Sequence, residues 1–344
     1  MGQKEISHMA TLTSTDLTLL DVARRTAPDG TIADIVEVLQ ETNEMLQDAP
    51  VKQCNNGTRN DTTIRDGEPP YEWKIINKGI GRGKSTTHQV TDTTARAEAL
   101  LRLDKAQPAK NKAKLRMTEN QAQIMALNKG IGGDLIYSNT NVDPEEMLGF
   151  APRYAKISGG SLKDQIISAS GSGSDNTSIY IIGWHTDFGC ALLYPDSEGD
   201  GPGLEHTDLG TQLVTDANGK EYPAWVDHYV WNIGLCIQNP RAVVRICNID
   251  VSDLTKDAAT GAHLFNLITE AYWKIKRAQI PGLSFKCYMN TTIMEYFDYQ
   301  SRQHNAKIQL TWREAGPDSK PVMHFRDMAF RQHDQILNSE ATVS

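Results

Sequence analysis

The sequence is poor in aromatic residues and cysteine, and it has no long apolar run. Aromatic residues make up 7% of the 344 residues. No run approaches the roughly 20 apolar residues of a membrane-spanning helix, so we expect no integral membrane protein. The five cysteines are scattered and never form C-x-x-C, a spacing that fits neither a disulfide framework nor a zinc site. No charged-then-apolar leader opens the chain, so we expect no secretory signal and a reducing cytoplasm.

Recognisable catalytic motifs are also missing. Gly83-Lys84-Ser85 matches the end of a phosphate-binding loop, but the glycine required five places earlier is replaced by Lys78. The nine histidines never form H-E-x-x-H, and there is no G-x-S-x-G elbow or G-x-G-x-x-G turn between a strand and a helix. We therefore predict no catalytic residue, no cofactor, no metal site and no enzyme.

The remaining composition is that of a folded protein. Hydrophobic residues make up 39% and charged residues 23%, which argues against disorder, collagen and a coiled-coil rod. The length allows one large domain or two to three ordinary ones. The mean hydropathy of −0.47 indicates a large solvated surface or one that contacts partners.

Charge is distributed unevenly along the chain. Residues 1–50 hold 3 Lys/Arg and 9 Asp/Glu, residues 51–116 hold 14 and 7, and residues 117–344 hold 18 and 27. An acidic arm followed by a basic segment favours docking of one on the other, within a chain or between copies, although plain solvated surface is the simpler alternative. The net charge of −8 argues against a dedicated nucleic-acid binder.

The first hundred residues contain elements that need a partner surface. We predict short helices over 17–25 and 32–50, the second with one apolar face and ended by Pro50. That face consists of Ile32, Ile35, Val36, Leu39 and Leu46. A β-hairpin follows, with a strand over 71–77, a flexible connection over 78–84 and a Thr-rich return strand over 85–94. An isolated two-stranded ribbon is marginal in water, so it needs another surface to lie on.

The rest of the chain has an α+β pattern. A helix is predicted over 117–138, with Thr118 and Gln121 as a capping box. Three glycines inside it, at 130, 132 and 133, indicate a bend or a close approach of another segment. The remaining predicted elements are strands over 178–184, 189–194, 228–238, 241–249 and 284–289, helices over 263–278 and 291–303, and a closing hairpin over 307–314 and 321–326.

Several runs together carry a resemblance to a known family. They include LTLLDVARRTAPDGTIADIVEVLQETNEMLQDAP (17–50), MLGFAPRY (147–154), SDNTSIYIIGWHTDFGCALLYP (174–195), DHYVWNIGLCIQNPRAVVRICNIDVSDL (227–254) and FRDMAFRQHDQIL (325–337). In wording and order, they are similar to the major capsid proteins of short-tailed and related tailed bacteriophages.

The resemblance implies an α+β, HK97-like capsid fold. Its expected parts are an N-terminal arm (1–50), an extended β-hairpin loop (51–106), a peripheral domain with a spine helix (107–159 and 301–344) and an axial domain (160–300). The implied function is a structural subunit that self-assembles, as hexamers and pentamers, into the icosahedral shell that encloses double-stranded phage DNA without sequence-specific binding.

The resemblance also implies a location and partners. The virion capsid would be assembled in the host bacterial cytoplasm, with no membrane, and scaffolding, portal and cement proteins are further partners that such shells use. An encapsulin-type nanocompartment shell, which encloses protein cargo, is the main alternative. A nucleotide-dependent enzyme and a soluble interaction protein are weaker ones.

We expect the hairpin of one copy to lie over the arm of the next. Exposed ion pairs contribute about 0–1 kcal/mol each, so apolar contacts from the hairpin should matter more than its charges. The residues predicted to make this contact are Arg65, Trp73, Lys74, Ile75, Lys78, Arg82 and Lys84 on the hairpin and Glu37, Glu41 and Glu44 on the arm.

Overall fold

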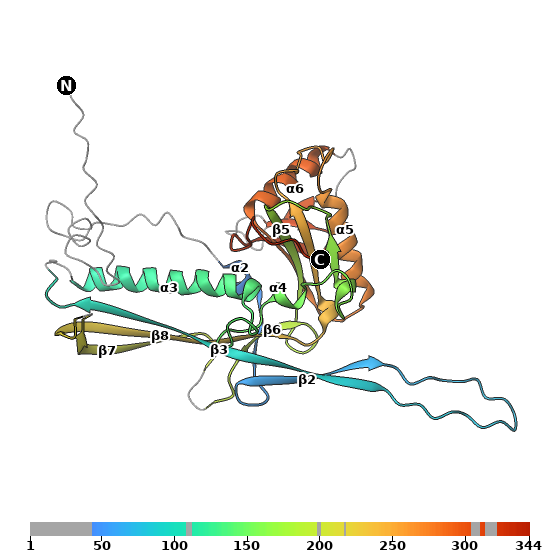
Figure 1. The fold of residues 1–344 in the computed structure, drawn as a ribbon, viewed down its shortest axis with the longest axis horizontal. Coiled ribbons are helices and arrows are strands. Elements are labelled where there is room, and N and C mark those ends of the chain that lie inside the picture. The colour runs from blue at the N-terminus through green and yellow to red at the C-terminus, as the bar shows by residue number, and fades with distance from the viewer. Residues whose placement is uncertain (1–42, 108–111, 198–200, 217, 304–309, 314–321) are drawn as a thin grey trace. The chain divides into compact units, whose positions relative to one another are not determined.

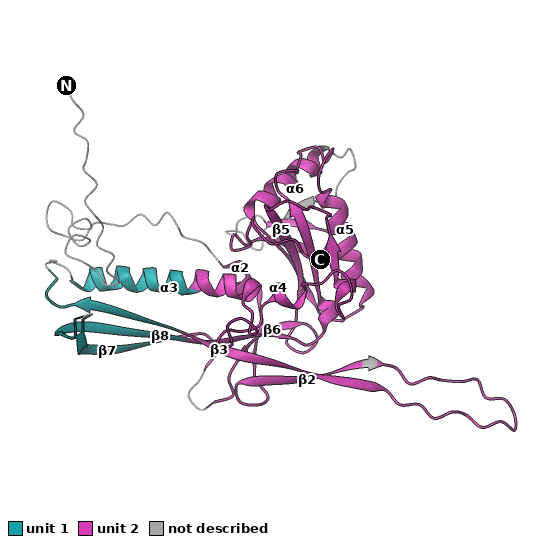
Figure 2. Ribbon diagram, in the orientation of Figure 1, with its two compact units in different colours: residues 1–40, 98–127, 205–230 teal, residues 41–97, 128–204, 231–344 magenta. Residues whose placement is uncertain are grey.

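The structure is a computed structural model (Figure 1), and it describes residues 43–107, 112–197, 201–216, 218–303, 310–313 and 322–344. The helix predicted over 17–25 and most of the arm lie outside these ranges. The chain divides into two compact units (Figure 2). The described residues of unit 1 fall within 98–127 and 205–230, and those of unit 2 within 43–97, 128–204 and 231–344.

Unit 2 is built around one central strand, β5 (Asn176–Trp184), all of whose residues are buried. Its antiparallel neighbours are β9 (Val243–Asp250) and β10 (Ser284–Met289). The sheet continues with β4 (Ile166–Ser168) beside β9, and with β13 (Met328–Gln332), β12 (Val322–Phe325) and β11 (Leu310–Arg313) beyond β10. Near Trp184, β6 (Cys190–Tyr194) joins β5 and also pairs with β1 (Val51–Gln53) and with the last residues of β8 (Glu221–Ile237).

Alternation along β5 produces two apolar cores. Ile179 and Ile181 point to one face, which is covered by α5 (Leu264–Arg277) and α6 (Thr291–Gln303). Side chains between them, among them Tyr180, pack in the other core with the last turns of α3 (Lys112–Tyr137) and with α4 (Phe150–Arg153). Because both faces of β5 are covered, its residues 179–184 form a continuous run without charged side chains, in place of an alternation of apolar and polar residues.

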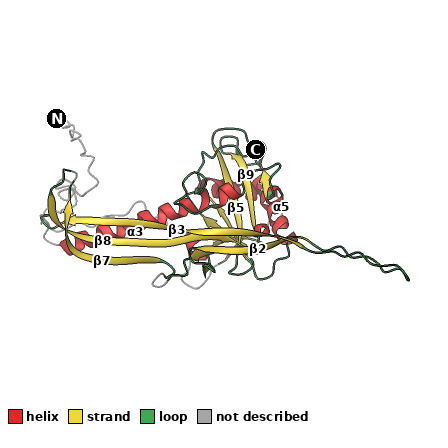
Figure 3. Cartoon of the chain, turned by 60° about the horizontal axis from the view of Figure 1, so that its bottom comes forward, coloured by secondary structure: helices red, strands yellow, loops and turns green. Residues whose placement is uncertain are grey.

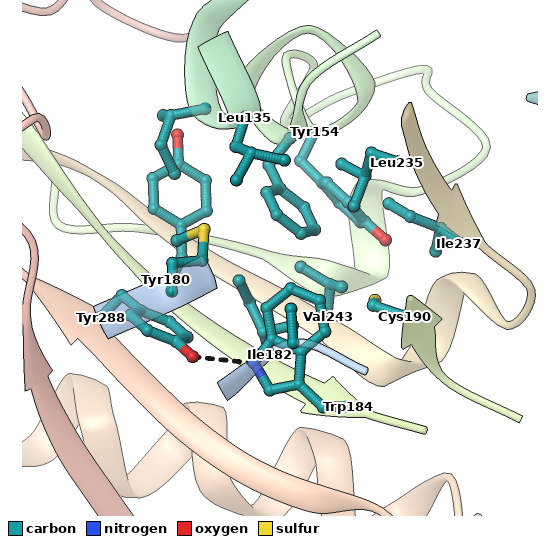
Figure 4. Packing of buried hydrophobic residues seen from close by; sticks show 14 of the residues in the cluster. Leu135, Tyr154, Tyr180, Ile182, Trp184, Cys190, Leu235, Ile237, Val243 and Tyr288 are labelled. Carbon is teal, nitrogen blue, oxygen red and sulfur yellow. Dashed lines mark hydrogen bonds between the residues drawn. The ribbon is translucent and has the colours of Figure 1, made fainter. Parts of the chain in front are cut away.

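Aromatic side chains fill much of the second core (Figure 4). Trp184 donates a hydrogen bond from Nε1 to the Tyr288 hydroxyl over 2.8 Å, and the two rings meet edge to face. Phe150 from α4 packs against Trp184 and Tyr180 with ring centroids 6.3 Å apart. The polar ends of Trp184 and Tyr288 are therefore paired while their rings stabilise the core.

A buried ion pair ties the last residues of unit 2 to its sheet. Arg245 on β9 donates from Nη2 to the Glu340 carboxylate over 2.8 Å, and both side chains are about 95% buried. The same carboxylate accepts from the hydroxyls of Ser178 and Tyr137. Arg245 Nη1 donates to the Tyr154 carbonyl over 2.9 Å. The charges are thus compensated on all sides, which a buried pair requires.

Unit 1 contains the first turns of α3 with β7 (Leu204–Thr215), the start of β8 and the end of β3 (Thr86–Asp104). Arg116 on α3 contacts the carboxylates of Asp227 and Asp208, each at 2.6 Å. His206 lies 2.9 Å from Asp227 and stacks on Tyr229. Burial of Asp227 favours its protonated form, but the hydrogen bonds from Arg116 and His206 outweigh this and lower its pKa. The network joins the helix to the strands of this unit.

The predicted strands and helices of the second half are confirmed in unit 2, but β7 was not predicted and β8 is longer than expected. The start of α3 was also predicted wrongly. The helix begins at Lys112, so Thr118 is an interior residue whose hydroxyl donates to the Lys114 carbonyl, and it caps nothing. Of the three glycines in α3, only Gly132 is explained by a close approach: a Cβ there would lie 2.6 Å from the Asn43 amide, whereas a Cβ on Gly130 or Gly133 would meet nothing within 4 Å.

The helix predicted over 32–50 is not continuous through Asn43, and its part before Asn43 lies outside the described residues. Asn43 has non-helical backbone angles and accepts a hydrogen bond from Leu46 N, which makes it the N-cap of a short helix, α2 (Glu44–Asp48). An asparagine side chain favours this capping position over a helix interior, and periodicity alone does not reveal that.

We predict that Glu340→Ala lowers the free energy of unfolding of the unassembled protein by about 3–5 kcal/mol, because it leaves the buried Arg245 guanidinium without its counter-charge. Denaturant unfolding followed by circular dichroism measures the change. Ser339→Ala, at the exposed neighbouring position, is the matched control. Equal unfolding midpoints for the two variants would show that the ion pair does not support the fold.

Candidate inter-subunit surface

The hairpin forms from a different first strand than the sequence suggested. β2 (Arg59–Gly67) pairs antiparallel with the start of β3, with Arg59 opposite Thr93 and Arg65 opposite Thr87. The register shifts between Arg65 and Gly67, where one extra residue makes a bulge. The return strand predicted over 85–94 is confirmed, and it continues to Asp104.

The strand predicted over 71–77 is wrong. Residues 68–85 have no strand ladder and form the connecting segment, which we call the tip (Figure 3). Pro69 and Pro70 lack the backbone N–H that a ladder needs, so pairing stops at Gly67. Alternating apolar residues after the prolines mimic a strand without forming one.

The tip exposes its apolar side chains to solvent. Trp73 is 90% exposed and Tyr71 86%, and Ile75, Ile76 and Ile80 are also exposed. Scattered exposed apolar residues are ordinary, but five within ten residues form a patch that marks an interaction surface. Ile76 and Ile80 were not among the predicted contact residues, although their apolar side chains in a turn-rich segment are the signal that would have found them.

The predicted basic residues surround this patch. Lys74, Lys78, Arg82 and Lys84 are exposed, and no ion pair joins them to another described residue. Arg65 lies outside the tip, on the last regular ladder pair before it, and lines a pocket of about 590 Å³ together with Arg241. The structure therefore groups four of the five predicted cations with Trp73 and Ile75 and separates the fifth.

Polar contacts fix the inner half of the hairpin. The Asp61 carboxylate accepts hydrogen bonds from the Thr91 hydroxyl over 2.6 Å and from the Asn56 amide over 3.0 Å. These bonds lower the pKa of Asp61 below its ordinary value. Asn55 contributes two more bonds to the backbone of Asp61. With few apolar residues, the hairpin depends on such pairs.

A buried ion pair attaches the hairpin to the core of unit 2. Asp92 on β3 is 2% exposed and lies 2.7 Å from the Arg153 guanidinium, which also donates to the Leu235 carbonyl. A Cβ on Gly234 would lie 2.7 Å from the Thr93 carbonyl, so the glycine allows β8 to approach β3 closely. Neither Asp92 nor Arg153 was predicted, because the two are distant in sequence and give no local signal.

The acidic side of the predicted contact is only partly described. Glu44 is half-buried on α2, and its carboxylate accepts from Gln332 N over 3.1 Å. Burial raises the pKa of Glu44, although nearby Arg331 opposes this. Glu37 and Glu41 lie outside the described residues. Of the three predicted acids, Glu44 is therefore already bonded within its own chain, and the contact between copies stays a prediction.

The described residues offer no other chemistry at this surface. They contain no group of three or more His, Cys, Asp or Glu that could hold a metal ion. The described helices include none that is long and apolar enough to cross a membrane. All five cysteines are free and buried, and burial raises the pKa of Cys54 to about 11.

Comparison with known proteins defines the class. The chain is similar to the capsid protein of bacteriophage Epsilon15, with 36% identity, 97% of this chain and 99% of that chain covered, and a TM-score of 0.72. Its sequence also matches the major capsid protein GP7 family over residues 27–344. The chain is thus a structural subunit of a phage shell with an HK97-like fold. It belongs to the major capsid protein GP7 family.

More distant structures are also similar. The bacteriophage JBD30 capsid shows 11% identity, with 94% and 96% of the two chains covered and a TM-score of 0.45. The holo-SrpI encapsulin complex from Synechococcus elongatus shows 10% identity, with 67% and 96% covered and a TM-score of 0.36. No curated protein matches the chain.

We predict that the inner half of the hairpin loosens in acid. Because the pKa of Asp61 is lowered in the folded state, its contribution to stability is present above the ordinary value of 3.8 and is lost as the pH falls through the lowered one. Hydrogen exchange of residues 59–67, corrected for the intrinsic rate, should show less protection in that range.

Thr91→Val should move this loss of protection to higher pH, because it removes the strongest bond to Asp61. Thr87→Val is the control, because Thr87 lies on the same strand as Thr91 but opposite Arg65. This variant should keep the wild-type pH dependence. Identical curves for the two variants would rule out Asp61 as the group responsible.

Proposed function

We propose that copies of this chain close into an icosahedral shell of hexamers and pentamers that encloses double-stranded phage DNA. The observation that carries the proposal is the exposed tip, whose apolar side chains are not buried by the described part of their own chain. A subunit that exposes such a patch gains stability only when another copy covers it. Membership in a capsid family favours another copy as that partner.

Apolar contact should provide most of the stability of this interface. Fully burying a large apolar side chain contributes about 1.5–3 kcal/mol, whereas an exposed ion pair contributes about 0–1 kcal/mol. Trp73 and Ile75 therefore anchor the tip, and Lys74, Lys78, Arg82 and Lys84 orient it toward acidic residues of the neighbour. Glu37 and Glu41 on the arm are the acids we assign to this role, with Glu44 the weakest of the three because it is bonded to Gln332.

The four-part division of the chain belongs to the same proposal. The arm covers 1–50, the extended loop 51–106, the peripheral domain 107–159 and 301–344, and the axial domain 160–300. The hairpin of β2 and β3 supports the second of these, and α3 supports a spine helix in the third. Assembly in the host bacterial cytoplasm, and scaffolding, portal and cement proteins as further partners, complete the proposal.

The charge of residues 117–344 fits a shell that encloses DNA without binding it tightly. Residues 117–344 carry 18 Lys/Arg against 27 Asp/Glu. A lining with few cations makes few salt-dependent phosphate contacts, so packed DNA can move and be released. We therefore assign DNA enclosure to the shell as a container, with no sequence-specific contact.

We predict that Trp73→Ala impairs assembly more than Lys84→Ala does. Loss of the buried indole should weaken each tip contact by about 2 kcal/mol or more, and loss of the lysine by about 0–1 kcal/mol. Sedimentation of the purified proteins measures the fraction in particles at each concentration. Equal effects of the two substitutions would contradict the ranking of apolar over ionic contacts.

The contents of particles purified from infected cells test enclosure of DNA. We expect DNA of genome length that resists added nuclease, and purified empty shells that bind free DNA weakly at all salt concentrations. Particles that hold one folded protein cargo and no DNA would instead indicate an encapsulin-type compartment.

A further inference from the structure

One arginine of unit 2 has a backbone conformation that arginine rarely adopts. Phe325 pairs with Met328 in the hairpin of β12 and β13, which leaves Arg326 and Asp327 in the loop. The φ angle of Arg326 is 57°, in the left-handed region that favours glycine, asparagine or aspartate in such turns. Backbone strain of this kind is often found where a residue takes part in binding.

Three aromatic rings hold the Arg326 guanidinium. Its carbon lies 4.7 Å from the ring centroid of Tyr272, 5.0 Å from that of Phe325 and 5.3 Å from that of Trp273. Nη1 is buried without a hydrogen-bond partner, and no acid of the described chain pairs with the guanidinium. Cation–π contacts thus position this cation but leave its charge without a carboxylate.

The surface beside this arginine is apolar, basic and open. Trp273 on α5 is 51% exposed. The last turn of α5 carries three cations, Lys274, Lys276 and Arg277. Glu270 and Asp327 pair with the two lysines, so an excess of positive charge remains. Trp, Tyr and Arg are the residue types that contribute most to binding at protein interfaces. The surface therefore fits a partner that brings a carboxylate beside an apolar group.

Unit 2 presents such a segment elsewhere on its own surface. Residues 141–146 (NVDPEE), which we call the acidic loop, are all exposed, and Val142 is 71% exposed. The carboxylates of the loop make no ion pair with any residue that the structure describes. Val142 and Asp143 are adjacent, with Cα atoms about 3.8 Å apart. One apolar and one acidic side chain can therefore reach a ring and a guanidinium that lie side by side.

We propose that the acidic loop of one copy docks on the surface formed by Tyr272, Trp273 and Arg326 of the next copy. Val142 covers the exposed indole, and the Asp143 carboxylate accepts hydrogen bonds from the guanidinium, whose fork of donors suits a carboxylate. The inference rests on the proposed function and deepens it, because it gives the shell a contact between copies that does not involve the tip.

Charge favours the acidic loop over the tip as the occupant. The tip is also apolar, but its four cations would be repelled by those at the end of α5. The acidic loop carries carboxylates only. Because the two docked surfaces differ, the contact is head to tail, and head-to-tail contacts can close into rings. The proposed hexamers and pentamers are rings of this kind.

The first test separates a role in assembly from a role in folding. Arg326→Gly removes the guanidinium and introduces the residue that adopts a φ of 57° without strain. We expect an unfolding midpoint no lower than that of the wild-type subunit, and a concentration for half-maximal particle formation at least about tenfold higher. The matched control is Arg302→Ala, which removes a 71% exposed arginine on α6 and should assemble as the wild type does. Assembly of Arg326→Gly at the wild-type concentration, or a loss of assembly explained by a lower midpoint, would overturn the proposal.

A charge exchange tests the identity of the partner. Arg326→Glu and Asp143→Lys should each impair particle formation, and the double variant should restore it to within about threefold of the wild type. The control combines Arg326→Glu with Asp164→Lys, at an exposed acid outside the loop, and should not restore assembly. Absence of rescue, or equal rescue by both pairs, would overturn the proposal. Wild-type protein that forms no particles would instead contradict the proposed function, so the two failures are distinguishable.

Discussion

Two buried arginine–carboxylate pairs hold the hairpin to the core of unit 2. Arg245 pairs with Glu340 and also donates to the carbonyl of Tyr154, at the end of α4. The last residue of α4 is Arg153, and its guanidinium pairs with Asp92 at the inner end of the hairpin. The short helix therefore lies between two charge pairs that water does not reach. A ribbon with almost no apolar residues of its own gains a rigid base through these contacts.

The second half of the fold could be predicted from sequence because its signals are local. The apolar run over 178–184 and the one-sided pattern over 263–278 correspond to β5 and α5, since both elements bury whole faces in one chain. Predictions failed where one residue overrides a pattern. Asn43 is the N-cap of α2 although the apolar period predicts a helix interior there, and Pro69-Pro70 end a ladder ahead of residues that alternate like a strand.

For the candidate site, the sequence identified what is exposed and missed what supports it. Trp73 and Ile75 were predicted because apolar residues in a polar ribbon have no partner nearby, and both are exposed. Asp92 and Arg153 were missed because an ion pair between distant residues leaves no periodic signal. Polar strands such as β7 were missed for a related reason: most of its residues are exposed, so no alternation of apolar residues marks it.

The bulge that ends the β2 ladder helps to protect the open edge of this strand before the subunit joins a shell. Among the described strands, β3 is the only partner of β2, so the other side of β2 is an open edge of the kind that recruits strands from other molecules. Charged Arg59, Asp61 and Arg65 along it, and the irregular backbone before Gly67, oppose such recruitment. These features disfavour edge-to-edge pairing of β2 between unassembled subunits.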